Sequence, residues 1–437
     1  MAPPAPADAI AHGIGMVHQH FMLVPTFTVL ENVMLGAEPR ARLKPAAAEV
    51  RAELLELKRS IGLDVDPDAV VEDLPVGVQQ RVEILKALRR GARVLILDEP
   101  TGVLTPADTE RLFEILRGLR HSGVTILLIT HKLPEIMAVC DAVSVMRAGR
   151  IVGHRNPAQT TPAELAELMV GRKVALERAH EPGTPGALAL RVDDVTWRDA
   201  AGTVRLHRVS FELRSGEVLG VAGVSGNGQS VLLDVLAGIA PIQEGRLALA
   251  GGTVDRAHPA DSARMRRLRV AHVPEDRQRR GLVLPFEARE NAMLGYPGRF
   301  GDGMWAWPSA MESRALPIMN DFDVRPLETR LPAGGFSGGN QQKLVIAREF
   351  AEGPEILLLA QPTRGVDIGA IEFIHEKILS LKRQGCAILL VSVELDEILA
   401  LSDRIMVMHA GRAVGTVDQG AATRRQLGLM MAGEAPV

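Results

Sequence analysis

Two adjacent carboxylates follow a short apolar run in the first quarter of the chain. Residues 94–97 (VLIL) precede Asp98 and Glu99, and Pro100 follows them. Such a run before two acids is typical of a buried parallel strand whose carboxyl end opens into a crevice, where open α/β sheets place ligands. In nucleotide hydrolases, the first acid at such a position holds Mg²⁺ and the second orients or deprotonates the attacking water. A strand followed by an ordinary acidic turn explains these residues equally well, so other motifs must decide.

The composition favours a protein of several domains without a strong attraction to nucleic acid. The 437 residues are enough for two or more domains that each bury a core. A net charge of −3 and an aromatic content of 3% argue against a basic field and against base-stacking platforms. No run of about 18 apolar residues is present. Cys140 and Cys386 lie far apart in apolar stretches, which favours two reduced thiols over a disulfide.

The chain contains an internal repeat. The segment GVTILLITHKLPEI, from Gly123, recurs 262 positions later as GCAILLVSVELDEI, and MRAGRIVG recurs at the same spacing as MHAGRAVG. This register places Asp98 and Glu99 opposite Ala360 and Gln361. Chance does not produce a constant register over such a length, so we expect two copies of one domain. The second copy lacks both carboxylates.

The second copy contains a candidate phosphate-binding loop. An apolar strand pattern at 218–222 leads into GVSGNGQS, and a helical pattern follows. Glycines in such a loop let backbone N–H groups face phosphate oxygens, and the helix N-terminus adds partial positive charge. The spacing fits G-x-x-x-x-G-K-[ST], except that Gln229 stands at the lysine position. The predicted nucleotide contacts in this segment are Gly223, Ser225, Gly226, Asn227, Gly228, Gln229 and Ser230.

The first copy has no such loop in this sequence. Met16 aligns with His272, and the second copy continues upstream of that point to about Leu188, whereas few residues precede Met16. We therefore expect the sequence to be an N-terminally shortened form of a longer chain.

Together these motifs resemble the ATP-binding subunits of ABC transporters. The segment FSGGNQQ, which begins at Phe336, is similar to the ABC signature. The tandem copies resemble the fused ATPases of bacterial simple-sugar importers, and Gln229 with the segment AQPTRG resembles the branch associated with nucleosides. The resemblance implies an α/β fold of two tandem P-loop ATPase domains, each a RecA-like core with a helical subdomain, the first N-terminally incomplete. The domains are expected at 1–156 and 188–433, with a linker at 157–187.

The resemblance also implies roles for individual residues. Each ATP is expected to lie between the phosphate loop of one domain and the signature of the other. Glu99 is then the expected general base, and His131 the expected contact to the γ-phosphate. The residues expected near Mg²⁺ are Asp98, Gln19 and Ser230. The signature residues expected to contact nucleotide are Ser337, Gly338, Gly339 and Gln341.

The second site is expected to bind nucleotide without turnover. Gln229, Ala360, Gln361 and Val393 replace the lysine, the two acids and the histidine, and Pro75 stands at the signature serine of the first copy. A general base alone contributes about 10²–10⁴-fold to a rate, so these changes should abolish hydrolysis there. At the position of Gln19 in the first copy, the second copy has the segment Glu275-Asp-Arg277. The resemblance implies a role for this segment in signalling between the domains.

The implied function is ATP hydrolysis coupled to import of a nucleoside or simple sugar. The implied partners are two integral-membrane permease subunits, indirectly an extracytoplasmic substrate-binding protein, and a second copy in self-association, with no nucleic acid. The implied location is peripheral, on the cytoplasmic face of the inner membrane. The apolar segment at 21–32 is either a surface that receives a permease helix or packing core. The alternatives are a nucleotide-binding subunit that does not hydrolyse, and a soluble ABC protein that acts on ribosomes or DNA, which the acidic charge disfavours.

Overall fold

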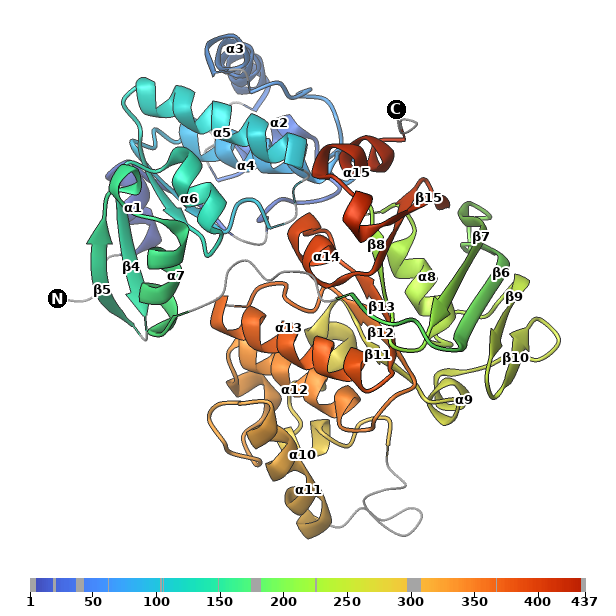
Figure 1. The fold of residues 1–437 in the computed structure, drawn as a ribbon. Helices are drawn as coiled ribbons and strands as arrows, with labels where there is room; N and C mark the ends of the chain where they lie inside the picture. The colour runs from blue at the N-terminus through green and yellow to red at the C-terminus, as the bar shows by residue number, and fades with distance from the viewer. Residues whose placement is uncertain are drawn as a thin grey trace. The chain divides into compact units, whose positions relative to one another are not determined.

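The computed structural model divides the chain into two compact units, Met1–Val174 and Ala175–Val437, which contain the two copies of the repeat (Figure 1). The residues that the structure describes are 5–18, 21–36, 43–61, 63–102, 104, 106–147, 149–173, 182–224, 226–296, 308–366 and 368–433. Within this part of the chain, no helix combines the length and hydropathy needed to cross a bilayer.

The first unit is built on a parallel sheet of three strands in the order β1-β2-β3. These strands are β1 (Ile14–Val17), β2 (Val94–Asp98) and β3 (Thr125–Ile129), and β4 (Val143–Arg147) pairs antiparallel with β5 (Arg150–Arg155). The helices are α1 (Pro6–Ala11), α2 (Val29–Met34), α3 (Leu43–Ile61), α4 (Val76–Arg89), α5 (Pro106–His121), α6 (Leu133–Val139) and α7 (Pro162–Val170), with 3₁₀ turns at Val71–Asp73 and Pro157–Gln159. The strand predicted before the two carboxylates is therefore present and parallel to both neighbours.

The core of the first unit covers one face of this sheet. Leu95 and Leu97 of β2 are fully buried against helices that include α4, where Val82 and Leu85 are also fully buried. The apolar spacing of α4 puts these side chains on the helix face toward the sheet. On β3, by contrast, Leu127 is 53% exposed. The sheet is thus half buried, and the prediction of a buried strand holds for alternate residues of β2.

The boundary between the units, after Val174, lies within the predicted linker, but the first part of that linker contains a helix. Residues 162–170, at the start of the expected linker, form α7, whose Leu165 and Ala166 are fully buried. Thr161 caps this helix by accepting a hydrogen bond from the Glu164 N–H. Residues 157–187 are rich in proline and alanine, as linkers often are, but such a composition is also compatible with a short helix that has proline at its first position.

The second unit contains two sheets. Its central sheet has the order β11-β12-β13-β8-β14-β15, parallel except for the last strand, and its other sheet is antiparallel, in the order β10-β9-β6-β7. The strands are β6 (Leu188–Arg198), β7 (Val204–Arg214), β8 (Val218–Ala222), β9 (Glu244–Leu249), β10 (Gly252–Asp255), β11 (Val270–Val273), β12 (Ile356–Ala360), β13 (Ala387–Val391), β14 (Arg404–His409) and β15 (Arg412–Asp418).

Helices lie between and beside these strands. They are α8 (Gln229–Leu236), α9 (Ser262–Arg267), α10 (Ala288–Asn291), α11 (Pro308–Asp321), α12 (Gly338–Phe350), α13 (Ile368–Arg383), α14 (Leu395–Leu401) and α15 (Arg424–Met431), with a π-helical turn at Arg277–Gly281 and 3₁₀ turns at Ala333–Gly335 and Gln419–Ala421. This alternation of strands and helices places the loops after β8, β11 and β12 at the carboxyl ends of parallel strands.

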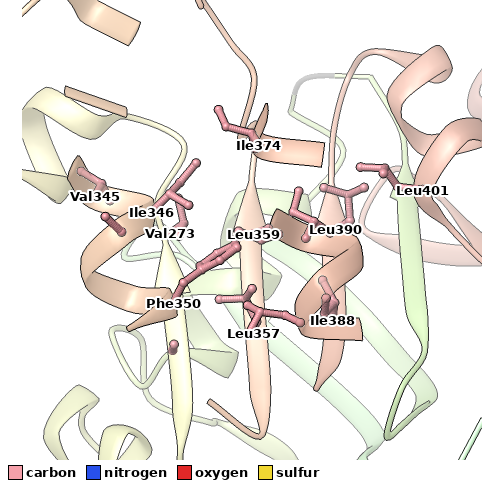
Figure 2. Packing of buried hydrophobic residues seen from close by; sticks show 14 of the residues in the cluster. Val273, Val345, Ile346, Phe350, Leu357, Leu359, Ile374, Ile388, Leu390 and Leu401 are labelled. Atoms are coloured by element: carbon pink, nitrogen blue, oxygen red, sulfur yellow. The ribbon is translucent and has the colours of Figure 1, made fainter. Parts of the chain in front are cut away.

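The central sheet of the second unit is buried on both faces. Leu357 and Leu359 of β12 pack with Phe350 and other side chains on one face (Figure 2). Leu358, between them, points to the opposite face and packs with Leu232 of α8. Because neighbouring side chains of a strand point to opposite faces, both faces need a covering layer, and the second unit supplies both.

Candidate functional site

The two predicted catalytic residues of the first unit are in contact. Asp98 ends β2, and Glu99 follows with a left-handed backbone (φ 43°) and an N–H that donates to the Ile129 carbonyl at 2.9 Å. His131 Nδ1 lies 2.9 Å from Glu99 Oε1, and the two side chains are 22% and 26% exposed. A carboxylate held by an imidazole and reached by solvent can take a proton from a bound water.

Polar contacts that the sequence did not predict hold the turns around this pair. Thr101 Oγ1 donates to the buried Glu135, and Thr130 Oγ1 donates to the other oxygen of the same carboxylate at 2.8 Å. Gln80 Nε2 donates to the Pro100 carbonyl at 2.5 Å. These bonds connect the turn after β2 to the turn after β3 and to α4. The recurrence of Glu135 as Glu397 in the repeat was the sequence signal that could have identified it.

The second unit has the same backbone conformation at the equivalent position but lacks the carboxylates and the imidazole. Gln361 also has a left-handed backbone (φ 48°), and its N–H donates to the Val391 carbonyl at 2.8 Å. Its side-chain Oε1 accepts a hydrogen bond from the Val393 N–H at 3.3 Å, where the first unit has the imidazole. Ala360 is 2% exposed and packs in the apolar core. A left-handed conformation is uncommon for residues other than glycine, so its presence at both positions indicates a shared architecture.

The predicted phosphate loop connects β8 to α8. Gly226 and Gly228 both have positive φ angles (92° and 98°), and Gly228 is the residue that precedes α8. A side chain at Gly223 would collide with the amide of Gln229, which is 5% exposed and lies across the start of the loop. The loop therefore has the strand, glycine turn and helix N-terminus that an anion site requires.

Asn227 ties this loop to the turn between β14 and β15. Its carbonyl accepts a hydrogen bond from the Gly411 N–H at 3.1 Å, and its side-chain Oδ1 accepts one from the Ala410 N–H at 3.2 Å. Asn227 therefore positions the loop through its polar atoms. Two predicted site residues, Gln19 and Ser225, lie outside the described residues.

Comparison with known proteins identifies the family. A family model described as ABC transporter matches residues 5–102 and 206–364, which include the turn after β2, the phosphate loop and the start of α12. The chain belongs to the ABC transporter family.

Curated ABC relatives match along nearly the whole chain. The nucleoside import ATP-binding protein NupA of Lactococcus lactis subsp. cremoris is 42% identical, over 98% of this chain and 85% of its own length. The guanosine import ATP-binding protein NupO of Bacillus subtilis is 42% identical, over 98% of this chain and 84% of its own length. The ribose import ATP-binding protein RbsA of Chromobacterium violaceum is 39% identical, over 96% of this chain and 82% of its own length.

The segment predicted as the ABC signature of the second unit lies at the N-terminus of α12. Ser337 precedes the helix, and its Oγ accepts a hydrogen bond from Asn340 Nδ2 at 2.9 Å. Gly338 lies so close to the Arg277 guanidinium that an added Cβ would be 2.5 Å from its Nη2. Gln341 is 4% exposed and donates to backbone carbonyls of the preceding loop at 3.1 Å, so its side chain points inward. The first unit has Pro75 before α4, without a side-chain cap.

The oxygen atoms at these turns suit Mg²⁺. Within the described residues, no group of three or more His, Cys, Asp or Glu side chains lies together as a metal cage. Mg²⁺ in nucleotide sites is held by one or two carboxylates together with phosphate oxygens and water. In the first unit, Asp98 at the end of β2 is such a carboxylate. In the second unit, the Ser230 hydroxyl at the start of α8 is at the position from which the serine of a phosphate loop binds Mg²⁺.

Proposed function

We propose that this chain is the ATP-binding subunit of an importer for a small solute, with nucleosides as the preferred class. The contact between Glu99 and His131, 2.9 Å apart at the end of the sheet of an ABC protein, carries the proposal. The names of the relatives support the cargo class, since NupA and NupO are named for nucleoside and guanosine import. Sugar importers are similar to a comparable degree, since the glucose import ATP-binding protein TsgD13 of Haloferax volcanii is 42% identical and RbsA is 39% identical. The nucleoside class is therefore proposed on Gln229 and the segment AQPTRG as well.

In the proposed mechanism, Glu99 accepts the proton of the water that attacks the γ-phosphate. His131 orients this carboxylate and contacts the γ-phosphate. Asp98 and Gln19 are proposed to hold Mg²⁺, which when bound neutralises phosphate charge. The hydroxyl of Ser337 and the backbone N–H groups of Gly338 and Gly339 are proposed to bind phosphate at the N-terminus of α12.

The second domain is proposed to bind ATP without splitting it. Its loop can hold phosphate through backbone N–H groups and Ser230, while Gln229 brings no charge to the β- and γ-phosphates. Ala360 and Gln361 leave no carboxylate at the end of β12. Nucleotide in this domain is therefore structural or regulatory in our proposal.

The proposed partners follow from the import function. Two permease subunits would form the path across the inner membrane, an extracytoplasmic binding protein would deliver the solute, and this chain would lie on the cytoplasmic face. Self-association of the chain is part of the same proposal.

Solute uptake by cells tests this function. We expect deletion of the gene to abolish uptake of radiolabelled nucleosides while uptake of ribose continues. Restoring the gene should restore nucleoside uptake, and restoring it with Glu99→Gln should not. Unchanged nucleoside uptake in the deletion strain would contradict the proposal. If only ribose uptake were lost, the transported solute would be a simple sugar and not a nucleoside.

A subunit that binds nucleotide without hydrolysis is the second candidate, because the loop in this sequence carries Gln229. Saturable ATP binding to the purified chain without phosphate release would favour it, provided that the complex isolated with its permeases also fails to hydrolyse ATP.

A further inference from the structure

Lys86 links helix α4 to the segment that follows β1. Its Nζ donates a hydrogen bond to the Met22 carbonyl at 2.7 Å, although the two residues are 64 positions apart in the chain. The Lys86 side chain is 13% exposed, so little water competes for the ammonium group. A hydrogen bond from a charged donor is stronger than one between neutral groups. This contact therefore fixes a backbone atom of the segment after β1 against α4.

A buried acid directs this ammonium group. Glu83 precedes Lys86 by about one turn of α4, and its Oε1 lies 3.8 Å from Lys86 Nζ. The Glu83 side chain is 6% exposed, and within the described residues its Oε1 accepts no hydrogen bond. Because a buried carboxylate requires a nearby cation, the pair keeps Lys86 in place beside the backbone. Neither residue has a part in the mechanism proposed above.

The second copy makes the same contact with different residues. Arg348 occupies the position of Lys86 in the repeat, and its Nη1 donates to the Gly281 carbonyl at 2.8 Å. Gly281 is the counterpart of Met22, since each lies ten residues before an asparagine whose side chain makes the same backbone hydrogen bonds in both copies. The fully buried Glu349 accepts a hydrogen bond from Arg348 Nε at 2.8 Å, so an acid accompanies the cation here too.

The contact is the same although the connecting segments differ in length. Residues 18–21 separate β1 from Met22, whereas residues 274–280 separate β11 from Gly281. The longer segment includes a π-helical turn at Arg277–Gly281, a conformation that is frequent at functional sites. Both copies thus hold the matched carbonyl by a cation on the equivalent helix, with or without the additional residues.

The segment held by Lys86 carries Gln19, which is proposed above to hold Mg²⁺ and lies outside the described residues. One end of this segment is β1, which pairs with β2 and packs so closely on α4 that a Cβ added to Gly15 would lie 3.0 Å from Ala87 Cβ. The other end is the Met22 carbonyl. Because a displacement of about 1 Å can cost about 10²-fold in rate, fixing both ends matters for catalysis.

We propose that Lys86 is a positioning residue for ATP hydrolysis by the first domain, and that it acts by holding the turn after β1 through the Met22 carbonyl. This inference rests on the proposed function, in which Glu99 takes the proton of the attacking water and Gln19 helps to hold Mg²⁺. In this role Lys86 contacts neither nucleotide nor metal. Its loss frees the segment from α4, so that the metal is held less tightly.

Two measurements on the complex isolated through its permease test the proposal. The rate of ATP hydrolysis as a function of Mg²⁺ concentration gives the turnover and the half-saturating metal concentration. Hydrogen exchange without nucleotide or metal reports on the amides of residues 18–27. Lys86→Met keeps the apolar stem and removes the ammonium group. We expect it to raise the half-saturating Mg²⁺ concentration by about tenfold or more, to leave the KM for ATP at saturating Mg²⁺ within about twofold, and to speed exchange in residues 18–27.

Three further variants separate positioning from folding. Lys86→Arg introduces the residue of the second copy and should restore both measurements, because the Arg348 guanidinium reaches the matched carbonyl. Glu83→Gln combined with Lys86→Met leaves no unpaired charge and should show the same shifts as Lys86→Met alone. Arg348→Lys is the reciprocal change in the second copy. It should leave the Mg²⁺ dependence within about twofold, because the second domain does not split ATP in our proposal.

The outcomes distinguish this inference from the function on which it rests. If the wild-type complex hydrolyses no ATP at any Mg²⁺ concentration, the proposed function is wrong and the role of Lys86 falls with it. If Lys86→Met lowers the rate by one factor at every Mg²⁺ concentration and speeds exchange throughout the first unit, Lys86 stabilises the fold and is not a positioning residue. Unchanged Mg²⁺ dependence, or unchanged exchange in residues 18–27, would also overturn the inference and leave the proposed function standing.

Discussion

Strands β3 and β13 have nearly the same sequence and different surroundings. TILLI in β3 and AILLV in β13 occupy equivalent positions, and each follows a parallel strand in the sheet. Leu389 and Val391 of β13 are 0% and 5% exposed, whereas their counterparts Leu127 and Ile129 are 53% and 45% exposed. In the second unit, β8 pairs with β13 and residues of β6, β7 and α8 cover its face. In the described part of the first unit, β3 pairs with β2 alone.

This difference shows that an apolar strand does not determine its own burial. The local sequence determines the extended conformation of the strand. The neighbouring strand and the layer that covers the sheet determine how much of the strand's apolar surface is removed from solvent. The same holds for chemistry, because Glu99 and Gln361 share a left-handed backbone and only the first retains a carboxylate. Among the described residues, the unit whose sheet is covered on both faces is the one whose site lacks the carboxylates.

Truncation of equivalent leucines tests the packing side of the comparison. Leu389→Ala should destabilise the second unit by about 2–5 kcal/mol, because a cavity replaces a fully buried side chain. In the 437-residue chain, Leu127→Ala should cost less than about 1 kcal/mol, because Leu127 is 53% exposed there. Hydrogen exchange of backbone amides, followed in peptides from each unit, measures both. Equal costs would mean that Leu127 is covered in solution.

Acid stability tests a position where the two copies differ by a titratable group. Burial lowers the pKa of His272 to about 4, so the folded state keeps it neutral. The unfolded chain binds a proton near pH 6.5, so the contribution of His272 to stability is complete above that pH and is lost as pH falls toward 4. The control variant is His272→Met, which introduces the residue found at the equivalent position of the first copy, Met16. Between pH 7.5 and pH 5, the free energy of unfolding of the wild type should fall by about 2 kcal/mol more than that of His272→Met.

Urea unfolding at the two pH values, followed by tryptophan fluorescence, measures this difference in the second unit, since all three tryptophans lie in that half of the sequence. The same pH dependence in both proteins would show that His272 is not the group responsible.

The hydroxyl contacts of Glu135 give the smallest expected effect. Thr101→Val removes a donor from a buried carboxylate and should destabilise the first unit by about 1–2 kcal/mol. The equivalent Thr363→Val should cost less, because Glu397 is bonded by His375 Nε2 at 3.2 Å. Hydrogen exchange of α6 and α14 reports the two effects. A larger cost at Thr363 would reverse this part of the comparison.

The sequence predicted those features that depend on order and spacing along the chain. It placed the strand before Asp98, the strand, loop and helix around Gly228, and Glu99 with His131 in one site, because repeated motifs carry register. It did not predict the contact of Lys86 with the Met22 carbonyl or the inward position of Gln341, which depend on how distant segments meet. It also missed α7, since the burial of Leu165 depends on its neighbours in the fold.

ATP hydrolysis by the transporter with matched substitutions in the two copies tests the central claim most directly. The substitutions Glu99→Gln and Gln361→Ala are made in the chromosomal gene, and the complex is isolated through its permease. Glu99→Gln should lower the rate of ATP hydrolysis by about 10²–10⁴-fold, and Gln361→Ala should change it by less than about twofold. Undiminished hydrolysis in Glu99→Gln, or its loss in Gln361→Ala, would contradict the assignment of catalysis to the first copy.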